Sequence, residues 1–186
     1  MHTPLLPADV LLEVFSLVCA HSTICSHVDT PIALARVCRL WRDTAKHKHS
    51  LWSSFDIGCA DMHSQATQCL IVPYLLLHLQ RSGDAPLDIT IHHTPQMHEY
   101  VLSSILLHSA RWRSLDIDAR VAIRLQAYPV KGHLPLLRHL HVRHLASMFA
   151  QPQIDIFSKA PMLTSCTSDI ELQGLQLPYP QLRELN

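Results

Sequence analysis

Glycine is scarce in this chain of 186 residues. Its four glycines, Gly58, Gly83, Gly132 and Gly174, occur singly. Phosphate loops, dinucleotide-binding turns and nucleophile elbows need clustered glycines, because the backbone must turn tightly or approach a ligand closely. The sequence therefore predicts a protein that is not an enzyme and that needs no cofactor.

Charge and long hydrophobic runs are also scarce. Only 16% of the residues are charged, and 15 Lys and Arg balance 15 Asp and Glu. Without a net field the chain is not expected to bind nucleic acid or an anionic membrane. The longest apolar run, Leu70–Leu77, contains Pro73 and is too short to cross a bilayer. Asp9 and Glu13 argue against a secretory signal, so we expect a cytoplasmic or nuclear protein.

The six cysteines lack the dense spacing of a disulfide scaffold and are interpreted as reduced and mostly buried. One short segment carries four side chains that could bind a metal: Cys19, His21, Cys25 and His27. A tetrahedral zinc site could in principle form there. The spacing is not that of a usual zinc finger, however, and Cys19 continues an apolar helical pattern. The prediction is therefore that no metal is bound.

The N-terminal segment predicts an amphipathic helix that starts at Pro7, where a missing N–H costs nothing. Asp9 and Glu13 lie near the positive end of the helix dipole. The apolar residues follow a 3.6-residue period and form one stripe that needs a partner. These residues are Val10, Leu11, Val14, Leu17 and Val18.

A second helical pattern starts at Thr30-Pro31, with the threonine hydroxyl as the expected N-cap. Its predicted apolar face consists of Leu34, Val37, Cys38, Trp41 and Ala45. Three arginines, Arg36, Arg39 and Arg42, lie outside this face and are interpreted as a solvated helix surface.

These segments together resemble an F-box: a helix opened by Leu6-Pro7, a junction Val37-Cys38-Arg39-Leu40-Trp41-Arg42, and Leu51-Trp52 about ten residues later. Only the segment Ala20–Asp29 is longer than usual. The resemblance implies a small three-helix F-box over residues 1–52 and a substrate-recruiting subunit of an SKP-cullin-F-box ubiquitin ligase. The residues expected to bind the SKP-family adaptor, or to support that interface, are Leu6, Pro7, Val10, Leu11, Val14, Val37 and Trp41.

The remainder, residues 53–186, repeats a pattern of three large apolar residues in the order large-x-x-large-x-large. The middle positions are assigned to residues 55, 87, 115, 140, 166 and 185. Helical patterns lie between them at Gln65–Ser82 and Pro95–Arg111. The pattern resembles irregular leucine-rich repeats, because Ala60, His92, Arg120 and Leu145 replace the usual Asn or Cys. The fold class is thus α+β or an α/β repeat, a strand-helix array for substrate recognition. It ends at Asn186 inside a repeat, so we expect the array to be incomplete, and the isolated chain to self-associate or to need its continuation for solubility.

Polar residues between the second and third large positions should point away from the repeat core. This column is predicted to contain Asp56, Asp88, Asp116 and His141, flanked by Asp118. Stacked carboxylates could receive a basic segment of the substrate, although they could equally be a solvated sheet face. Two alternatives to the ligase function remain: an F-box-fold interaction protein outside a ligase, or a histidine and cysteine module that responds to metal.

Overall fold

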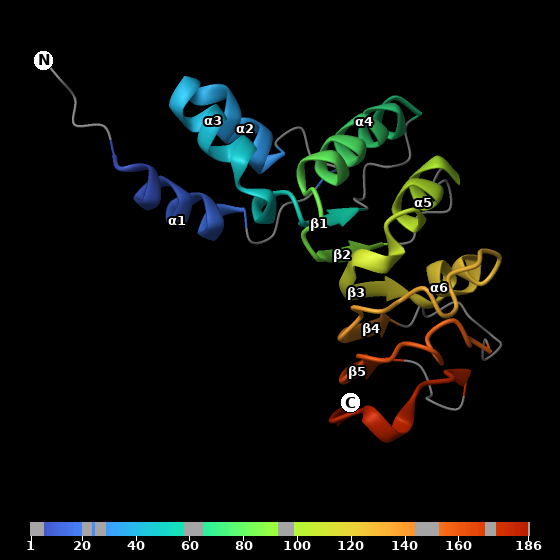
Figure 1. Ribbon diagram of the computed structural model, residues 1–186. Coiled ribbons are helices and arrows are strands. Elements are labelled where there is room, and N and C mark those ends of the chain that lie inside the picture. The colour runs from blue at the N-terminus through green and yellow to red at the C-terminus, as the bar shows by residue number, and fades with distance from the viewer. Residues whose placement is uncertain are drawn as a thin grey trace, which may run out of the picture.

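The computed structural model describes residues 6–19, 24, 29–57, 65–92, 99–143, 153–169 and 174–185, and for 65–70 only the backbone. These residues form a mixed α/β structure with six α-helices and one parallel sheet of six strands (Figure 1). The helices are α1 Ala8–Val18, α2 Thr30–Val37, α3 Arg39–His47, α4 Gln65–Arg81, α5 Glu99–Leu106 and α6 Ala119–Leu125. The strands are β1 Ser54–Ile57, β2 Leu87–Ile91, β3 Trp112–Asp118, β4 His139–Arg143, β5 Ser165–Ser168 and β6 Glu184–Leu185.

Helix α1 begins at Ala8, one residue later than predicted, because Pro7 is its N-cap. Leu11 and Phe15 are buried on one side of the helix. The Phe15 ring meets the Trp41 ring edge to face, with centroids 5.0 Å apart. This aromatic pair joins α1 to α3.

Helix α2 is capped by Asp29 and not by Thr30, so the predicted N-cap is wrong by one residue. The Asp29 side chain accepts a hydrogen bond from the Ile32 backbone N–H at 3.3 Å. Thr30 and Pro31 therefore occupy the first two helical positions. Proline is tolerated there because no N–H in the first turn has a partner within the helix.

The predicted common face of residues 34 to 45 does not form, because Cys38 interrupts the helix. Its backbone is extended, with φ −157° and ψ 176°, so α2 and α3 are separate helices. Val37 and Cys38 are exposed at the break, whereas Ala45 is fully buried in α3. Arg42 is half-buried and its Nε donates to the Ala35 carbonyl at 3.1 Å, which fastens α3 to α2 across the break.

The helical unit closes on Trp52, whose side chain is fully buried. Its Nε1 donates to the Ala45 carbonyl oxygen at 2.8 Å. The buried residues of this first core are Leu11, Phe15, Cys19, Ala35, Ala45, Leu51 and Trp52. A second, larger core lies on the sheet and is formed by residues from Phe55 onward. Ile24, from the segment between α1 and α2, also packs into this core. The domain division at residue 52 stays a prediction: Trp52 belongs to the first core and Phe55 to the second, while Leu77 of α4 packs against the first core.

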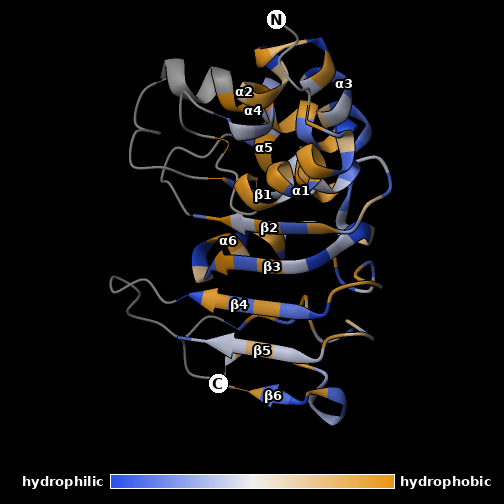
Figure 2. Cartoon of the chain, turned by 90° about the vertical axis from the view of Figure 1, so that its left-hand side faces the viewer, coloured by the Kyte–Doolittle hydropathy of each residue, from blue (hydrophilic) through white to orange (hydrophobic). Residues whose placement is uncertain are grey.

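The six strands pair in chain order, each parallel to the next. Helices α4, α5 and α6 lie on one face of the sheet (Figure 1). The opposite face is turned toward the viewer in Figure 2, with the strand beginnings on the right; helix α1 overlaps β1 in this view, and no helix covers β2 to β6. We call it the open face. Strand residues alternate between buried and half-buried, which is the pattern of a sheet covered on one side.

The register of β2 corrects the predicted frame. Phe55 pairs with Ile89, which pairs with Leu115, so the middle apolar position of β2 is Ile89 and not Leu87. Leu87 pairs with Trp112, and an irregularity between Leu87 and Asp88 absorbs the difference in spacing. Sequence spacing alone could not detect this irregularity, because Leu87, Ile89 and Ile91 are all large and alternate correctly in either register.

Helix α4 agrees with its prediction to within one residue, and α5 lies within the predicted segment 95–111. Gly83 ends the α4 segment with φ +53°, the left-handed conformation expected at a helix C-terminus. Helix α6 was not predicted. It follows β3 directly, and its N-cap is Asp118, whose Oδ1 accepts from the Val121 N–H at 3.0 Å.

The longest described helix, α4, has 17 residues. None of the helices in the described ranges combines the length and the hydrophobicity that a membrane crossing requires.

Candidate functional site

Helix α1 is apolar on two adjacent sides, and only one of them is buried. Leu11, Phe15 and Cys19 face the first core. The other side presents exposed apolar side chains with helical spacing, which we call the α1 stripe: Leu6, Val10, Val14, Leu17 and Val18. Leu17 is 78% exposed. A helix that is apolar beyond its buried stripe has surface for a partner.

The structure separates the predicted adaptor residues into two groups. Leu11 belongs to the buried core and Trp41 is half-buried against it, so both support the fold. The other members are exposed: Leu6, Pro7, Val10, Val14 and Val37. Sequence periodicity missed the distinction because buried and exposed apolar residues lie side by side on the same helix.

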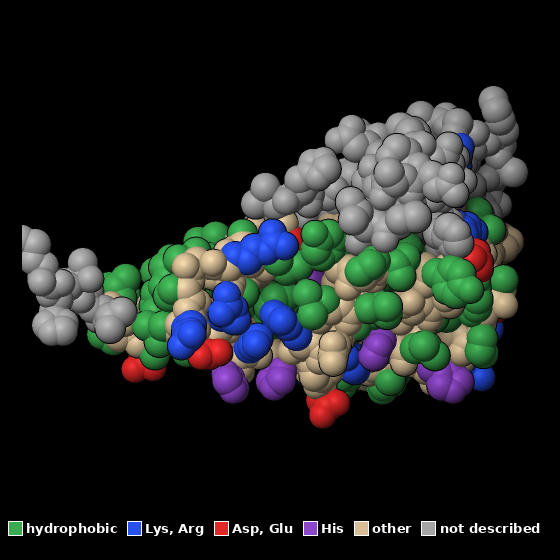
Figure 3. Space-filling model, turned by 90° about the horizontal axis from the view of Figure 1, so that it is seen from above, with side chains coloured by type: hydrophobic (Ala, Val, Ile, Leu, Met, Phe, Trp, Pro, Cys, Tyr) green, Lys and Arg blue, Asp and Glu red, His purple; other side chains and the backbone are tan. Residues whose placement is uncertain are grey.

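A shallow groove of about 310 Å³ lies beside the start of α1. It is lined by Ala8 and Leu12 of α1, by Asp43, Thr44 and His47 of α3, and by Lys48. Figure 3 shows hydrophobic side chains next to Lys and Arg side chains at this end of the molecule. Arg36, Arg39 and Lys46 are exposed on α2 and α3, as the solvated-surface interpretation predicts for the two arginines. An apolar surface with basic neighbours favours an acidic partner, because complementary charge speeds encounter.

A buried polar pair joins the helical unit to the sheet. His78 of α4 is fully buried, and its Nε2 lies 2.7 Å from Asp29 Oδ2. Its Nδ1 lies 3.2 Å from the Trp52 carbonyl oxygen. The ring also meets Trp52 and Phe55 edge to face, at 5.1 and 5.5 Å between centroids. No local sequence pattern predicts this pair, because its partners are separated by 49 positions in the chain.

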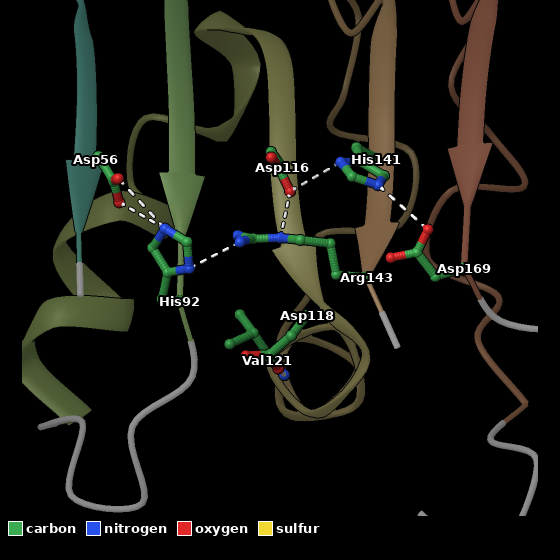
Figure 4. Close-up of polar contacts among 8 residues, drawn as sticks. All are labelled: Asp56, His92, Asp116, Asp118, Val121, His141, Arg143 and Asp169. Atoms are coloured by element: carbon green, nitrogen blue, oxygen red, sulfur yellow. Dashed lines mark hydrogen bonds and ion pairs between the residues drawn. The ribbon is translucent and has the colours of Figure 1, made fainter. Parts of the chain in front are cut away.

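A second polar assembly, the open-face network, lies near the carboxyl ends of the strands (Figure 4). His92 Nε2 lies 3.3 Å from Asp56 Oδ2, and Arg143 Nη1 lies 2.7 Å from His92 Nδ1. Because a guanidinium only donates, Nδ1 of this histidine accepts and Nε2 donates. Arg143 Nε lies 2.7 Å from Asp116 Oδ1 at ion-pair distance. The network thus connects carboxylates of β1 and β3 through side chains that follow β2 and end β4.

His141 continues the open-face network toward β5. Its Nδ1 lies 3.3 Å from Asp116 Oδ1 and its Nε2 lies 3.8 Å from Asp169 Oδ1. Burial raises the pKa of the Asp56 carboxyl, and the adjacent His92 opposes part of that shift. The network is therefore a set of mutually compensated charges and not a row of free carboxylates.

This arrangement corrects the predicted acidic column. The pairing places Thr90 between Asp56 and Asp116, so Asp88 does not belong to the column. Like charges in it are two strands apart, roughly 10 Å, and each already has a cationic or imidazole neighbour. Asp118 is buried as the N-cap of α6 and does not flank an open surface. A basic substrate segment is consequently not required to neutralise this face.

Asp88 has a different role, at the strand beginnings. Arg113 Nε donates to Asp88 Oδ1 at 2.9 Å, and Nη2 of the same guanidinium donates to Oδ2. This two-point contact raises the pKa of Arg113, with the hydrogen bond as the first cause. Arg113 is thereby occupied within the chain.

The weak metal candidate is only partly described. Cys19 is buried in the first core, and burial raises the pKa of its thiol to about 11. A neutral thiol is the poorer metal ligand, since metals bind the thiolate. His21, Cys25 and His27 lie outside the described residues. Within the described ranges no group of three or more His, Cys, Asp or Glu could hold a metal ion.

Comparison of the chain with known protein families, with curated proteins and with solved structures finds no match. The function is therefore argued from the surfaces described above.

Proposed function

We propose that this chain is the substrate-recruiting subunit of an SKP-cullin-F-box type ubiquitin ligase. In this proposal residues 1–52 are an F-box that binds the SKP-family adaptor through the α1 stripe. The observation that carries it is the pair of apolar sides on α1, one buried in the first core and one exposed. A lone surface helix needs only the first of these.

Three further observations support the proposal. The chain forms three short helices, and Leu51 and Trp52 close their core, as the resemblance to an F-box implies. Basic side chains of α2 and α3 are exposed on the same helical unit, and Lys48 lines the groove beside α1. The sheet stacks its strands strictly in chain order, with helices on one face. In the proposal this second part is an irregular leucine-rich-repeat-like array that presents its open face, or its rim, to a protein substrate.

The proposal is tested by co-expression of the chain with an SKP-family adaptor and measurement of the dissociation constant of the complex. Truncation of an interface anchor commonly costs about 2 kcal/mol, which is roughly thirtyfold in affinity. Leu17→Ala and Val14→Ala should each weaken the complex on this scale, while the helical content is kept because alanine favours helix.

Leu107→Ala is the matched control. Leu107 is 85% exposed but follows α5, on the other side of the sheet from the open face. Its truncation should leave adaptor binding within twofold. Absence of a complex with folded wild-type protein, or equal losses for all three variants, would contradict the proposal. If the adaptor binds but no cullin co-purifies, the alternative of an F-box-fold interaction protein outside a ligase is the better description.

A further inference from the structure

A pocket of about 560 Å³ lies where β4, β5 and β6 begin, at the opposite ends of the strands from the open-face network. Two guanidinium side chains, Arg138 and Arg183, line it together with polar and apolar neighbours. The other lining residues are His139, Pro161, Met162, Thr164, Ser165 and Glu184. A pocket of this size accommodates a charged group together with part of the chain that carries it.

The two arginines belong to one column of the sheet. The Arg138 N–H donates to the Arg113 carbonyl at 2.8 Å, the Thr164 N–H to the Arg138 carbonyl at 3.0 Å, and the Arg183 N–H to the Thr164 carbonyl at 2.8 Å. Strands in a sheet lie about 4.8 Å apart, so Arg138 and Arg183 start roughly 10 Å apart, on either side of Thr164. Long side chains from both positions can therefore close on one group above the threonine.

The arginines of this column differ in whether their side chains are paired with another residue. Arg113 is held at two points by Asp88. Neither Arg138 nor Arg183 makes a side-chain hydrogen bond or ion pair with any residue in the described ranges. Glu184 also lines the pocket. With His139 counted as neutral, the two arginines and this glutamate give the pocket a formal charge of +1. The pocket is thus a cationic site with unused donors.

We propose that this pocket binds the phosphate group of a phosphorylated protein segment. Each guanidinium offers a planar fork of donors, which matches phosphate oxygens at two points. The hydroxyl-bearing residues Thr164 and Ser165 also line the pocket; the Thr164 hydroxyl already donates to the Arg138 carbonyl at 3.3 Å, whereas the Ser165 hydroxyl can donate to a third oxygen. A phosphate monoester, with nearly two charges and three terminal oxygens, uses this set more fully than a carboxylate does. The site does not involve α1 and does not depend on the adaptor proposal.

The test uses the full chain and blocked amino-acid probes, N-acetyl-phosphoserine-N-methylamide and its glutamate counterpart, titrated by NMR at low salt. Phosphoserine should shift the backbone amide signals of Thr164 and Arg183, and the affinity should fall as salt is added. Arg138→Gln and Arg183→Gln should each weaken binding tenfold or more. Arg138→Lys should weaken it severalfold, because the charge remains but the fork is lost. Glu184→Gln should strengthen it, because a carboxylate that repels the phosphate is removed.

Arg113→Gln is the matched control, since Arg113 occupies the same column but is already paired; it should leave binding within twofold. All of these residues are exposed, and circular dichroism checks that each variant is folded. The proposal is wrong if glutamate binds as tightly as phosphoserine, if neither probe shifts these amides, or if Arg113→Gln weakens binding as much as Arg138→Gln. Equal affinity for free inorganic phosphate, with the same amides shifted, would refute the part of the proposal that requires a protein segment.

Discussion

Removal of the Asp29 carboxylate should destabilise the protein more than any exposed acidic substitution. Asp29 caps α2 through the Ile32 N–H and also accepts from His78 in the interior. Loss of an N-cap costs about 1 kcal/mol. A buried ring nitrogen without an acceptor costs roughly 1–3 kcal/mol more. Asp29→Ala should therefore lower the free energy of unfolding by roughly 2–4 kcal/mol, which overlaps the range of about 3–5 kcal/mol for a broken buried ion pair.

Urea unfolding followed by far-ultraviolet circular dichroism measures this loss. Asp29→Asn should cost about 1 kcal/mol or less. The amide oxygen can replace Oδ1 as the helix cap, and the amide NH2 in the place of Oδ2 can donate to His78 Nε2 when the ring carries its proton on Nδ1 and donates it to the Trp52 carbonyl. Asp43→Ala is the control: Asp43 is exposed on α3, and a change there should stay within about 0.5 kcal/mol.

A double-mutant cycle then isolates the pair. Replacing both partners by apolar residues, Asp29→Ala with His78→Leu, leaves no orphaned polar group, so the double variant should lose less stability than the two single losses added together. A coupling free energy of about 1 kcal/mol or more is expected. If the single losses simply add, or if Asp29→Ala is no worse than Asp43→Ala, the contact does not hold the helical unit to the sheet.

Three further predictions concern the two buried thiols and the turn at Gly83. Burial raises the pKa of Cys19 and Cys166 to about 11, so brief alkylation of the native protein at pH 8, read by peptide mass spectrometry, should modify exposed Cys38 well before either of them. In the folded state both thiols keep their protons up to about pH 11, whereas unfolded thiols ionise near pH 9. The free energy of unfolding should therefore fall as the pH rises from about 9 toward 11. In urea titrations, a Cys166→Ala variant should show a shallower fall over this pH range. Gly83→Ala should cost about 1 kcal/mol or more, because φ is +53° and the added Cβ would lie 3.0 Å from a histidine ring; a variant as stable as wild type would show that this turn relaxes freely.

Local patterns predicted most of the elements, because helix starts and apolar periods depend on neighbouring residues. The strands at 55–57, 115–117 and 140–142 were found from the spacing of large side chains, and α4 was found to within one residue. Helix α6 was missed because it has only seven residues and follows β3 without a loop, so its N-cap carboxylate was interpreted as part of an acidic strand face.

The predicted acidic column was wrong in part, because it depends on pairing between distant segments. One irregularity between Leu87 and Asp88 moved Asp88 out of its expected column. Arg143 and His92, 51 positions apart, then occupy the carboxylates that remain. Neither contact can be inferred from spacing along the chain, since both depend on how far each strand is shifted against the next.

The sequence by itself determined most of the elements, their order, and the alternating apolar positions that form the core on the sheet, because burial of apolar side chains follows the period of each strand. Only the tertiary structure decided which of the equally apolar residues of α1 face inward, which charges neutralise each other, and which arginines stay free. These outcomes depend on the register of six strands and on contacts such as Asp29 with His78, in which groups far apart in the chain satisfy each other where water is excluded.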